Sequence, residues 1–391
     1  MSGGKDRPYR YWLTNIRGIG KKRKISLLQK LGSAEEIFRA EQEVLQKAAG
    51  EAAAGKIRES KKDWDILAEY EKLCRQKINF TCYGDTDYPK RLAEIPDAPF
   101  GLYYQGHLPS DRMPAVAVIG ARACSEYGVY VAREFGSKLA EAGIQIISGL
   151  AMGIDGISQE AALAAGGESF GILGCGVDVC YPKCNRHLYE KCRLQGGIVS
   201  EYPPGTKPAA ALFPPRNRII SGLSDLVVVI EAREKSGTLI TVDMALEQGR
   251  EVLAVPGRIT DSLSRGCNSL FRQGAGVAVS PLDILEALSG PGYHINMEET
   301  LKKGRENVFS GMESILIREL PAQEKQVYEQ LEVLPRTPEE LWQKTGMALT
   351  IQEVMGALVE LCLKGFAEAR PEGYCKKILA TKKNKGIMVD D

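Results

Sequence analysis

Residues 115–150 read AVAVIGARACSEYGVYVAREFGSKLAEAGIQIISGL, and this stretch decides the fold. It opens with a short apolar run rich in β-branched residues, continues with a helical stretch at residues 126–143, and closes with a second short run at residues 144–150. Parallel strands need a crossover between them, and that crossover is usually a helix. The stretch therefore predicts a strand, a helix and a second, parallel strand.

The same alternation continues downstream. Helical stretches separate further apolar runs, ESFGILG, GGIVSEY, DLVVVIEA and EVLAVPG, which begin at residues 168, 196, 225 and 251. Strands that alternate with helices form parallel sheets with helices on both faces. The sequence thus predicts an α/β domain with a Rossmann-like, doubly wound and mainly parallel sheet, which we place at residues 101–290.

The regions on either side have different patterns. Residues 1–100 show apolar positions at helical spacing and predict a helical N-terminal domain. Residues 291–320 are polar and contain glycine, as linkers do. Residues 321–378 predict three helices followed by a hairpin, which is the winged-helix pattern, and residues 379–391 form a tail.

The third helix of the predicted winged helix is a poor match to DNA. A helix that reads DNA should present positive or amide groups to a groove. This helix carries Glu353, Glu360 and only one cation, Lys364. We therefore expect a protein-contact or a structural role rather than major-groove reading.

Composition narrows the classes of function. The 391 residues suit two or three domains, and the 44% hydrophobic content is enough for a core. The net charge is only +1, so an anion site must come from local clustering. No apolar run reaches the length of about 18 residues that a membrane span needs, and residues 1–12 lack a signal-peptide core. We expect a cytoplasmic protein without a membrane span.

Four of the ten cysteines gather in one region, at Cys175, Cys180, Cys184 and Cys192, with His187 among them. Their spacing is not the Cys-x-x-Cys pairing of common zinc sites. Cysteines in a cytoplasmic chain are normally thiols rather than disulfides. We predict ordinary thiols and no metal.

Turn residues follow most of the predicted strands. In a doubly wound sheet the ligand lies outside the carboxyl ends of the strands. Backbone N–H groups and helix N-termini gathered there favour phosphate. The candidate residues are Gly120, Arg122, Ser125, Gly149, Gly153, Gly174, Gly176, Lys235, Ser236 and Gly237.

These turns after the carboxyl ends of the strands form a rim of the sheet, and the sequence of this rim does not match a known cofactor site. Its first turn lacks the Gly-x-Gly-x-x-Gly spacing, and no Gly-Lys-Ser/Thr of a P-loop occurs. The nearest carboxylates are Asp155 and Glu231, and the position of Asp155 at a helix start is explained by the helix dipole. We therefore predict no cofactor and no catalytic residue.

Residues 213–225, FPPRNRIISGLSD, add an aromatic ring and positive charge to the rim. Lys207, Arg216 and Arg218 lie in a stretch without acidic residues, and two prolines stiffen the approach to Phe213. Cations beside a fixed aromatic surface hold single-stranded nucleic acid without reading its sequence. This pattern favours a single-strand binding site.

A structural interpretation of the same residues stays open. Phe213 could belong to the core, and the arginines could pair with Glu201 or Asp225. Asn217 lies between the two arginines, where it can donate and accept hydrogen bonds and so hold the chain in place.

A second candidate contact lies near the N-terminus, in IRGIG at residues 16–20. Gly18 and Gly20 suit a tight turn between two helices, and Lys21 and Lys22 begin the next helix. This resembles a helix-hairpin-helix motif, whose free N–H groups hold a DNA phosphate. A plain helical hairpin with a solvated basic turn explains the residues equally well.

Several motifs occur in a characteristic order between residues 115 and 288: VIGARACSEYG, SGLAMGIDG, GCGVDVCYP, SEYPPG, FPPRNRIISGLS, EAREKSGTLIT, EVLAVPG and GCNSLFRQGA. Together they resemble the DprA/Smf family of DNA-processing proteins of natural transformation. The flanking domains resemble those that many members carry. Members often have a histidine shortly after GID, whereas this chain has Ser158 and Gln159.

The resemblance implies a function in DNA uptake. Proteins of this family bind incoming single-stranded DNA without sequence preference, protect it, displace single-strand-binding protein and load the RecA recombinase. They form homodimers through the Rossmann-like domain, and no catalytic step is implied. The residues that would line the DNA pocket are the glycines of the rim together with Arg122, Arg216, Asn217, Arg218, Lys235 and Asn268.

An enzyme remains the alternative hypothesis. Related Rossmann-like proteins hydrolyse the N-glycosidic bond of nucleoside monophosphates with a glycine-threonine turn and a glutamate. EKSGTLIT, at residues 234–241, is similar to that turn. The expected acidic partners are weakly represented, so DNA binding is the favoured reading.

Overall fold

A computed structural model describes residues 3–289, 320–332 and 335–376. The chain divides into two compact units, Met1–Ile295 and Asn296–Asp391. Within the described residues, no helix is both long and apolar enough to cross a membrane.

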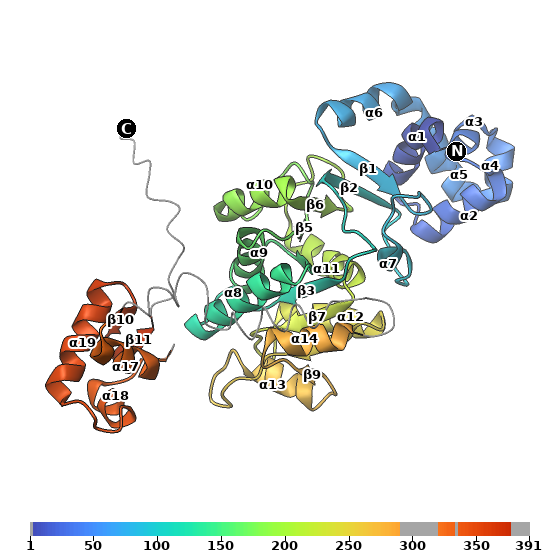
Figure 1. Ribbon diagram of the computed structural model, residues 1–391. Coiled ribbons are helices and arrows are strands. Elements are labelled where there is room, and N and C mark those ends of the chain that lie inside the picture. Colours follow the sequence, from blue (N-terminus) through green and yellow to red (C-terminus); the bar gives the residue numbers. More distant parts are fainter. Residues whose placement is uncertain (1–2, 290–319, 333–334, 377–391) are drawn as a thin grey trace. The chain divides into compact units, whose positions relative to one another are not determined.

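The first unit begins with a group of helices (Figure 1). These helices bury Trp12, Leu13, Leu27 and Ile57 in a core that continues into the neighbouring strands. Side-chain caps begin two of these helices, because the oxygens of Ser33 and Asp65 accept hydrogen bonds from backbone N–H groups in the first turn. The helices are α1 (Gly3–Asn15), α2 (Lys21–Leu31), α3 (Ala34–Arg39), α4 (Gln42–Ala49), α5 (Glu51–Asp63) and α6 (Ile66–Arg75).

A nine-stranded sheet follows, in the order β1-β2-β6-β5-β4-β3-β7-β8-β9. The strands from β3 to β9 pair in parallel with one another, which confirms the predicted mainly parallel sheet. The strands are β1 (Asn79–Cys82), β2 (Gly101–Gly106), β3 (Ala115–Ile119), β4 (Gln145–Ser148), β5 (Ser169–Ile172), β6 (Gly196–Ser200), β7 (Leu226–Val229), β8 (Glu251–Ala254) and β9 (Gly276–Val277).

Strand β1 differs from the prediction that the first hundred residues are helical, whereas β2 lies inside the predicted α/β domain. They pair antiparallel with each other, and β2 pairs antiparallel with β6. The sheet therefore begins at Asn79, upstream of the domain boundary that we predicted at residue 100. Aromatic side chains join this edge to the helices: Tyr11 on α1 contacts Phe80 and Tyr103 edge-on, and the Tyr103 hydroxyl donates to Asn15 Oδ1 over 3.0 Å.

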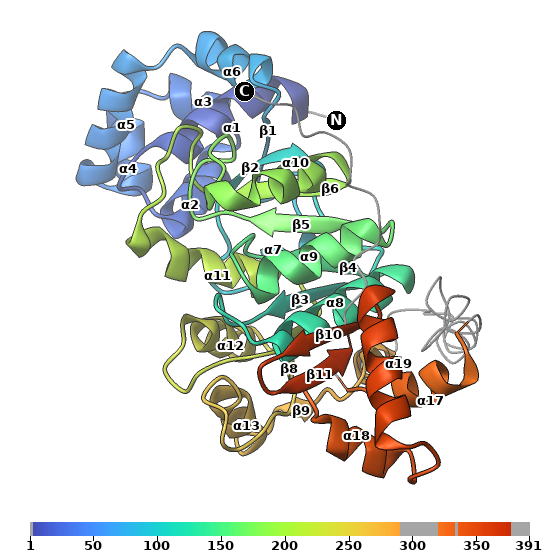
Figure 2. The ribbon, with the colours of Figure 1, turned by 90° about the vertical axis from the view of Figure 1, so that its left-hand side faces the viewer.

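Helices cover both faces of the sheet. On one face lie α8 (Glu126–Glu141), α9 (Ile154–Ala164) and α10 (Arg186–Leu194), and α14 (Pro281–Leu288) packs on α8 (Figure 2). On the other face lie α7 (Lys90–Ala93), α11 (Phe213–Gly222), α12 (Gly237–Glu247) and α13 (Arg265–Phe271). Alternate residues of β3, such as Ala117 and Ile119, point into this second layer.

Helix α11 corrects our interpretation of residues 213–222. We expected the two prolines to stiffen the approach to Phe213 and assigned no helix or strand to the stretch, which is the crossover helix between β6 and β7. Pro214 and Pro215 occupy its first turn, where the missing N–H has no intrahelical partner to lose. The helix buries Ile219 and Ile220 against the sheet.

The second unit has the winged-helix pattern that the sequence predicted. It contains α17 (Ala322–Gln330), α18 (Pro338–Lys344) and α19 (Ile351–Leu363), followed by the antiparallel pair β10 (Ala367–Arg370) and β11 (Gly373–Lys376). Capping boxes begin α18 at Thr337 and α19 at Thr350. Leu341 and Leu358 lie in its core.

The strand order reverses between β3 and β7. From β3 the chain moves outward through β4 and β5 to β6, and it then returns through α11 to form β7 on the other side of β3. The loops after β3 and β7 therefore diverge to opposite faces and leave a crevice between them. Ligands of doubly wound sheets bind at such a point.

Candidate functional site

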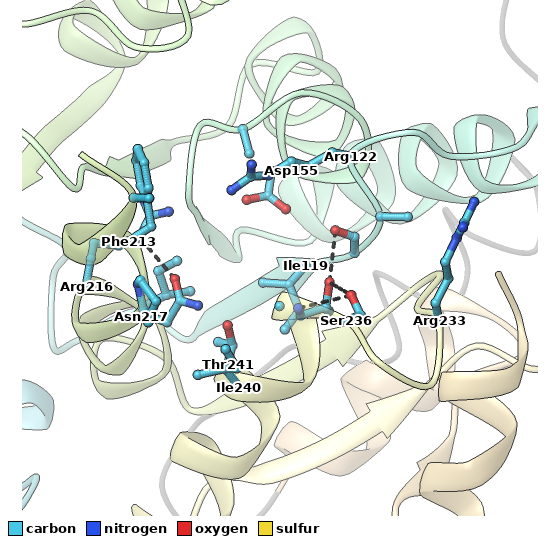
Figure 3. A pocket seen from close by; sticks show the side chains of 18 of the residues that line it. Ile119, Arg122, Asp155, Phe213, Arg216, Asn217, Arg233, Ser236, Ile240 and Thr241 are labelled. Carbon is cyan, nitrogen blue, oxygen red and sulfur yellow. Dashed lines mark hydrogen bonds between the residues drawn. The ribbon is translucent and has the colours of Figure 1, made fainter. Parts of the chain in front are cut away.

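A pocket of about 690 Å³ lies at this reversal of strand order. Its walls come from the turn after β3, the loop between β7 and α12, and the first turn of α11. Figure 3 shows Phe213 and Arg216 on one side of the pocket and Ser236 and Arg233 on the other. The predicted site residues that line it are Gly120, Arg122, Phe213, Arg216, Asn217, Lys235, Ser236 and Gly237.

The start of α12 forms one wall and is fastened to the turn after β3. Ser236 Oγ accepts a hydrogen bond of 3.2 Å from the N–H of Thr238 and so caps the helix. Thr238 Oγ1 donates to the carbonyl oxygen of Gly120 over 3.2 Å. No acidic residue occupies the first turn of α12, so the positive end of the helix dipole faces the pocket uncompensated.

Three cations stand at the rim, namely Arg122, Arg233 and Lys235. All three residues are exposed, and within the described ranges none of them forms an ion pair. An exposed guanidinium or ammonium without a protein partner keeps its donors available for an anion. The rim therefore offers exposed positive charge next to the N-terminus of α12.

Arg216 is different because it is buried, with 5% of its surface exposed. Its Nη1 donates to the carbonyl oxygens of Gly149, over 3.1 Å, and of Ile172. Asp155 lies beside it, and its Oδ2 accepts a hydrogen bond of 3.0 Å from the N–H of Gly149. Arg216 thus ties together the ends of β4 and β5 while one side of it borders the pocket.

Burial and charge oppose each other in this pair. Burial lowers the pKa of Arg216 to about 10, although the nearby Asp155 raises it. Burial also raises the pKa of Asp155, and the charge of Arg216 counteracts that rise. Arg216 remains charged at neutral pH, so it contributes positive potential to the pocket floor.

Arg218 lies outside the pocket, which corrects the expectation that it holds phosphate. Its two terminal nitrogens donate to the two carboxylate oxygens of Glu201 over 2.7 and 2.6 Å, and its Nε lies 3.2 Å from Asp97 Oδ2. Residues two apart in a helix are rotated by about 200° around the helix axis and so lie on nearly opposite faces. Arg216 and Arg218 therefore cannot face the same cavity. The structural interpretation, in which an arginine pairs with Glu201, holds for Arg218.

Two stacked rings form the aromatic wall. Tyr181 lies on Phe213 with ring centroids 5.4 Å apart and an angle of 27° between the planes. The guanidinium carbons of Arg122 and Arg216 each lie 5.9 Å from the centroid of Phe213. Phe213 is half-buried against the Gly174 turn, where a built Cβ would come within 2.7 Å of its ring. Phe213 is therefore both a packing residue and a pocket residue.

The remaining predicted site residues do not line the pocket, and several of them hold loops or helix ends in place. Ser125 caps α8 by accepting from the N–H of Gly128 over 3.1 Å. Gly153 has a φ of +76°, and a Cβ there would lie 2.2 Å from the carbonyl oxygen of Ala121. Asn268 donates to the Gly257 carbonyl oxygen over 3.0 Å. The predicted residues outside the pocket are Ser125, Gly149, Gly153, Gly174, Gly176, Lys207, Arg218 and Asn268.

Some pocket residues escaped the sequence analysis. Tyr181 follows a glycine turn in GCGVDVCYP, and its place in that motif was the available signal. Arg233 stands two residues before Lys235, and its charge was a signal that we did not use. The additional side chains that line the pocket include Asp155, Tyr181, Arg233, Thr238, Ile240 and Thr241.

The described cysteines near the pocket are not arranged to bind a metal ion. In the part of the chain that the structure describes, no group of three or more His, Cys, Asp or Glu side chains is placed to hold a metal ion. Burial raises the pKa of Cys175 to about 11 and that of Cys192 to about 12, so these thiols stay protonated at neutral pH.

The N-terminal turn joins α1 to α2 with Gly18 at a φ of +73°. Gly20 is the N-cap of α2, and Lys22 is exposed. The Nζ of Lys21 instead lies 4.4 Å from the centroid of the Tyr83 ring, where burial lowers its pKa. A DNA contact at this turn stays a prediction.

Comparison with known proteins identifies both units. The family model described as DNA recombination-mediator protein A matches residues 79–289, and the DprA winged helix domain matches residues 316–373. The chain is 45% identical over 223 residues to the DNA processing protein DprA of Streptococcus pneumoniae, covering 57% of this chain and 77% of that protein. It is 40% identical over 290 residues to protein Smf of Escherichia coli, covering 74% and 75%.

A solved structure agrees. The X-ray structure of the Streptococcus pneumoniae protein aligns with a TM-score of 0.63 and 35% sequence identity. The alignment covers 71% of this chain and 97% of that chain.

Proposed function

The chain belongs to the family of DNA recombination-mediator protein A, and on that basis we propose that it is a DNA-processing protein that holds single-stranded DNA in the pocket between β3 and β7. The observation that carries the proposal is the combination in one pocket of unpaired cations, a helix N-terminus and a stacked aromatic pair. These are the elements with which proteins hold single strands.

Each element has a separate role in the proposed complex. Arg122, Arg233 and Lys235 neutralise phosphates at the rim, and the N–H groups at the start of α12 donate hydrogen bonds to one phosphate inside the pocket. Bases stack on the Tyr181 side of the aromatic pair, because Phe213 already packs against Gly174. None of these contacts reads a base edge, so binding is independent of sequence.

The finer functions rest on the family resemblance. We propose that the bound strand is protected from nucleases, that single-strand-binding protein is displaced and that RecA is loaded during natural transformation. The same resemblance supports a homodimer that acts in the cytoplasm. Binding energy alone would drive these steps, without a catalytic residue or a cofactor.

The contacts of the two carboxylates near the pocket do not favour the enzyme alternative. Glu231 is held by Ser125, whose N–H donates to its Oε2 over 2.9 Å, and Asp155 is held by Gly149 and Arg216. A general acid or base must be free to reach a substrate proton. We expect nucleoside monophosphates to release no free base when they are incubated with the protein.

We expect the protein to bind single-stranded DNA in preference to duplex DNA of equal length, with an affinity that falls as salt rises. Neutralising the phosphates at Arg122, Arg233 and Lys235 should give a slope of log affinity against log salt near −2, from about −0.7 per phosphate. A fluorescence anisotropy titration with random-sequence oligonucleotides at several salt concentrations measures it. Salt-independent binding, or a preference for duplex, would contradict the proposal.

The aromatic wall gives a second expected result. Tyr181→Ala should weaken single-strand binding by about 1–3 kcal/mol while leaving the salt slope unchanged, because stacking releases no counterions. Tyr181 is 40% exposed, so its loss should barely change the melting temperature. Tyr130 on α8 is also 40% exposed and does not line the pocket, which makes Tyr130→Ala the matched control. Equal losses in both variants would mean that Tyr181 is no stacking platform.

A further inference from the structure

Helix α19 of the winged helix presents an apolar ridge to solvent. Met355, Val359 and Leu363 follow one another at a spacing of four residues, which forms a continuous row on a helix surface. All three residues are exposed, and Leu363 reaches 77%. The opposite face of the helix packs into the core through Val354 and Leu358. The ridge is therefore extra apolar surface that the fold of this unit does not use.

The charge beside the ridge is negative. Glu353 and Glu360 are seven residues apart and so lie along the same edge of α19. The only cation at the end of the helix, Lys364, is taken up by Glu324, whose two oxygens lie 2.7 Å from its Nζ. The helix that would enter a groove of DNA in this fold thus offers apolar side chains and carboxylates, which do not fit a polyanion.

Gly356 supplies a second, independent observation. Glycine in a helix interior costs about 1 kcal/mol relative to alanine. Its backbone here is ordinary helix, and a Cβ built on Gly356 has no atom within 4 Å. Nothing in the described part of the unit therefore requires glycine at this position. The missing side chain leaves a notch beside Met355 and Val359, where the backbone of another helix can approach closely.

We propose that the α19 ridge docks an amphipathic helix of another protein, with apolar residues on one face and lysine or arginine along the flank that meets Glu353 and Glu360. Complementary charge sets the choice of partner in such contacts. A second copy of this chain fits less well. In an antiparallel pair related by a two-fold axis, the acidic edges of both helices lie on the same side and repel each other.

The test uses the full chain and two synthetic helical peptides as probes. Both peptides carry leucines at a spacing of four residues, and their flanks are lysine in one and glutamate in the other. We expect the lysine peptide to bind about tenfold more tightly than the glutamate peptide, as measured by fluorescence anisotropy. Val359→Glu should abolish binding of the lysine peptide, and Gly356→Leu should do so by filling the notch. Leu194→Glu, at a residue of α10 that is 79% exposed, is the matched control and should bind normally.

A charge reversal at Glu360 distinguishes docking by complementary charge from non-specific binding to an apolar surface. Glu360→Lys should abolish the preference between the two peptides because the new lysine offsets the charge of Glu353, and its thermal melt should match that of the wild type because Glu360 is exposed and forms no described ion pair. Equal binding of both peptides to the wild type would overturn the proposal. So would binding that survives Val359→Glu, or a dimer in sedimentation analysis that Val359→Glu dissociates, since the occupant would then be a second copy. None of these outcomes bears on single-strand binding in the pocket.

Discussion

Arg216→Ala is expected to lower the free energy of unfolding of the first unit by about 3–5 kcal/mol, the typical effect of leaving a buried charge without its counter-charge. The substitution leaves the carboxylate of Asp155 buried without its counter-charge, and it removes the donor from the carbonyl oxygens of Gly149 and Ile172. Chemical denaturation followed by circular dichroism measures the loss. Arg216→Ala should therefore reduce DNA binding mainly through the folded fraction.

A double variant tests this explanation. Removing both charges of a buried pair costs less than removing one of them. Arg216→Met combined with Asp155→Asn should therefore be more stable than Arg216→Met alone. If Arg216→Ala unfolds at the same denaturant concentration as the wild type, the arginine is not the brace that its hydrogen bonds indicate.

The largest effect on binding should come from the rim. Arg122→Ala and Lys235→Ala should each weaken single-strand binding about tenfold and together about a hundredfold, since hydrogen bonds to charged groups contribute roughly 1.5–3 kcal/mol. Each substitution should also flatten the salt slope by about 0.7, because one phosphate fewer is neutralised. Both side chains are exposed and lack ion-pair partners in the described structure, so the melting temperature should not change.

The matched control is Arg133→Ala. Arg133 is exposed on α8 and does not line the pocket. Because both variants replace one arginine by alanine, Arg133→Ala and Arg122→Ala have the same net charge. It should retain the affinity and nearly the full salt slope of the wild type. A drop equal to that of Arg122→Ala would show that overall charge, rather than the pocket, governs binding.

The parallel sheet could be predicted because its strands are apolar runs separated by helices of clear periodicity. Strands β1 and β2 could not, because they lie outside the alternation of strands and helices: they pair antiparallel with each other, and β2 joins the sheet through β6, far along the chain. Helix α11 was not predicted although its signal was present, because proline is typical of the first turn of a helix.

The glycines and cations at strand ends indicated where the pocket lies, but spacing alone did not separate the side chains that face it from those that do not. Arg216 and Arg218 look equivalent in the sequence, and the helical geometry of α11 sends them to different neighbours. The sequence analysis named Glu201 as a possible partner of either arginine but could not say which, and the stacking of Tyr181 on Phe213 depends on the tertiary fold. Conformational glycines such as Gly153 were assigned to the ligand when they serve loop packing.

The aromatic contacts between α1 and the β1–β2 edge also bear on how the first unit loses its structure. Tyr11 and Trp12 share one continuous core with Phe80, Tyr103 and Ile198, so the helices and the sheet have no separate interiors. Cooperative units of local unfolding follow such shared cores. Amide hydrogens of α1 should therefore exchange with deuterium as slowly as those of β2, and a protease should find no cleavable joint between residues 79 and 106. Deletion of the N-terminal helices would remove the residues that pack against the β1–β2 side of the sheet, and it would not leave an independently folded domain.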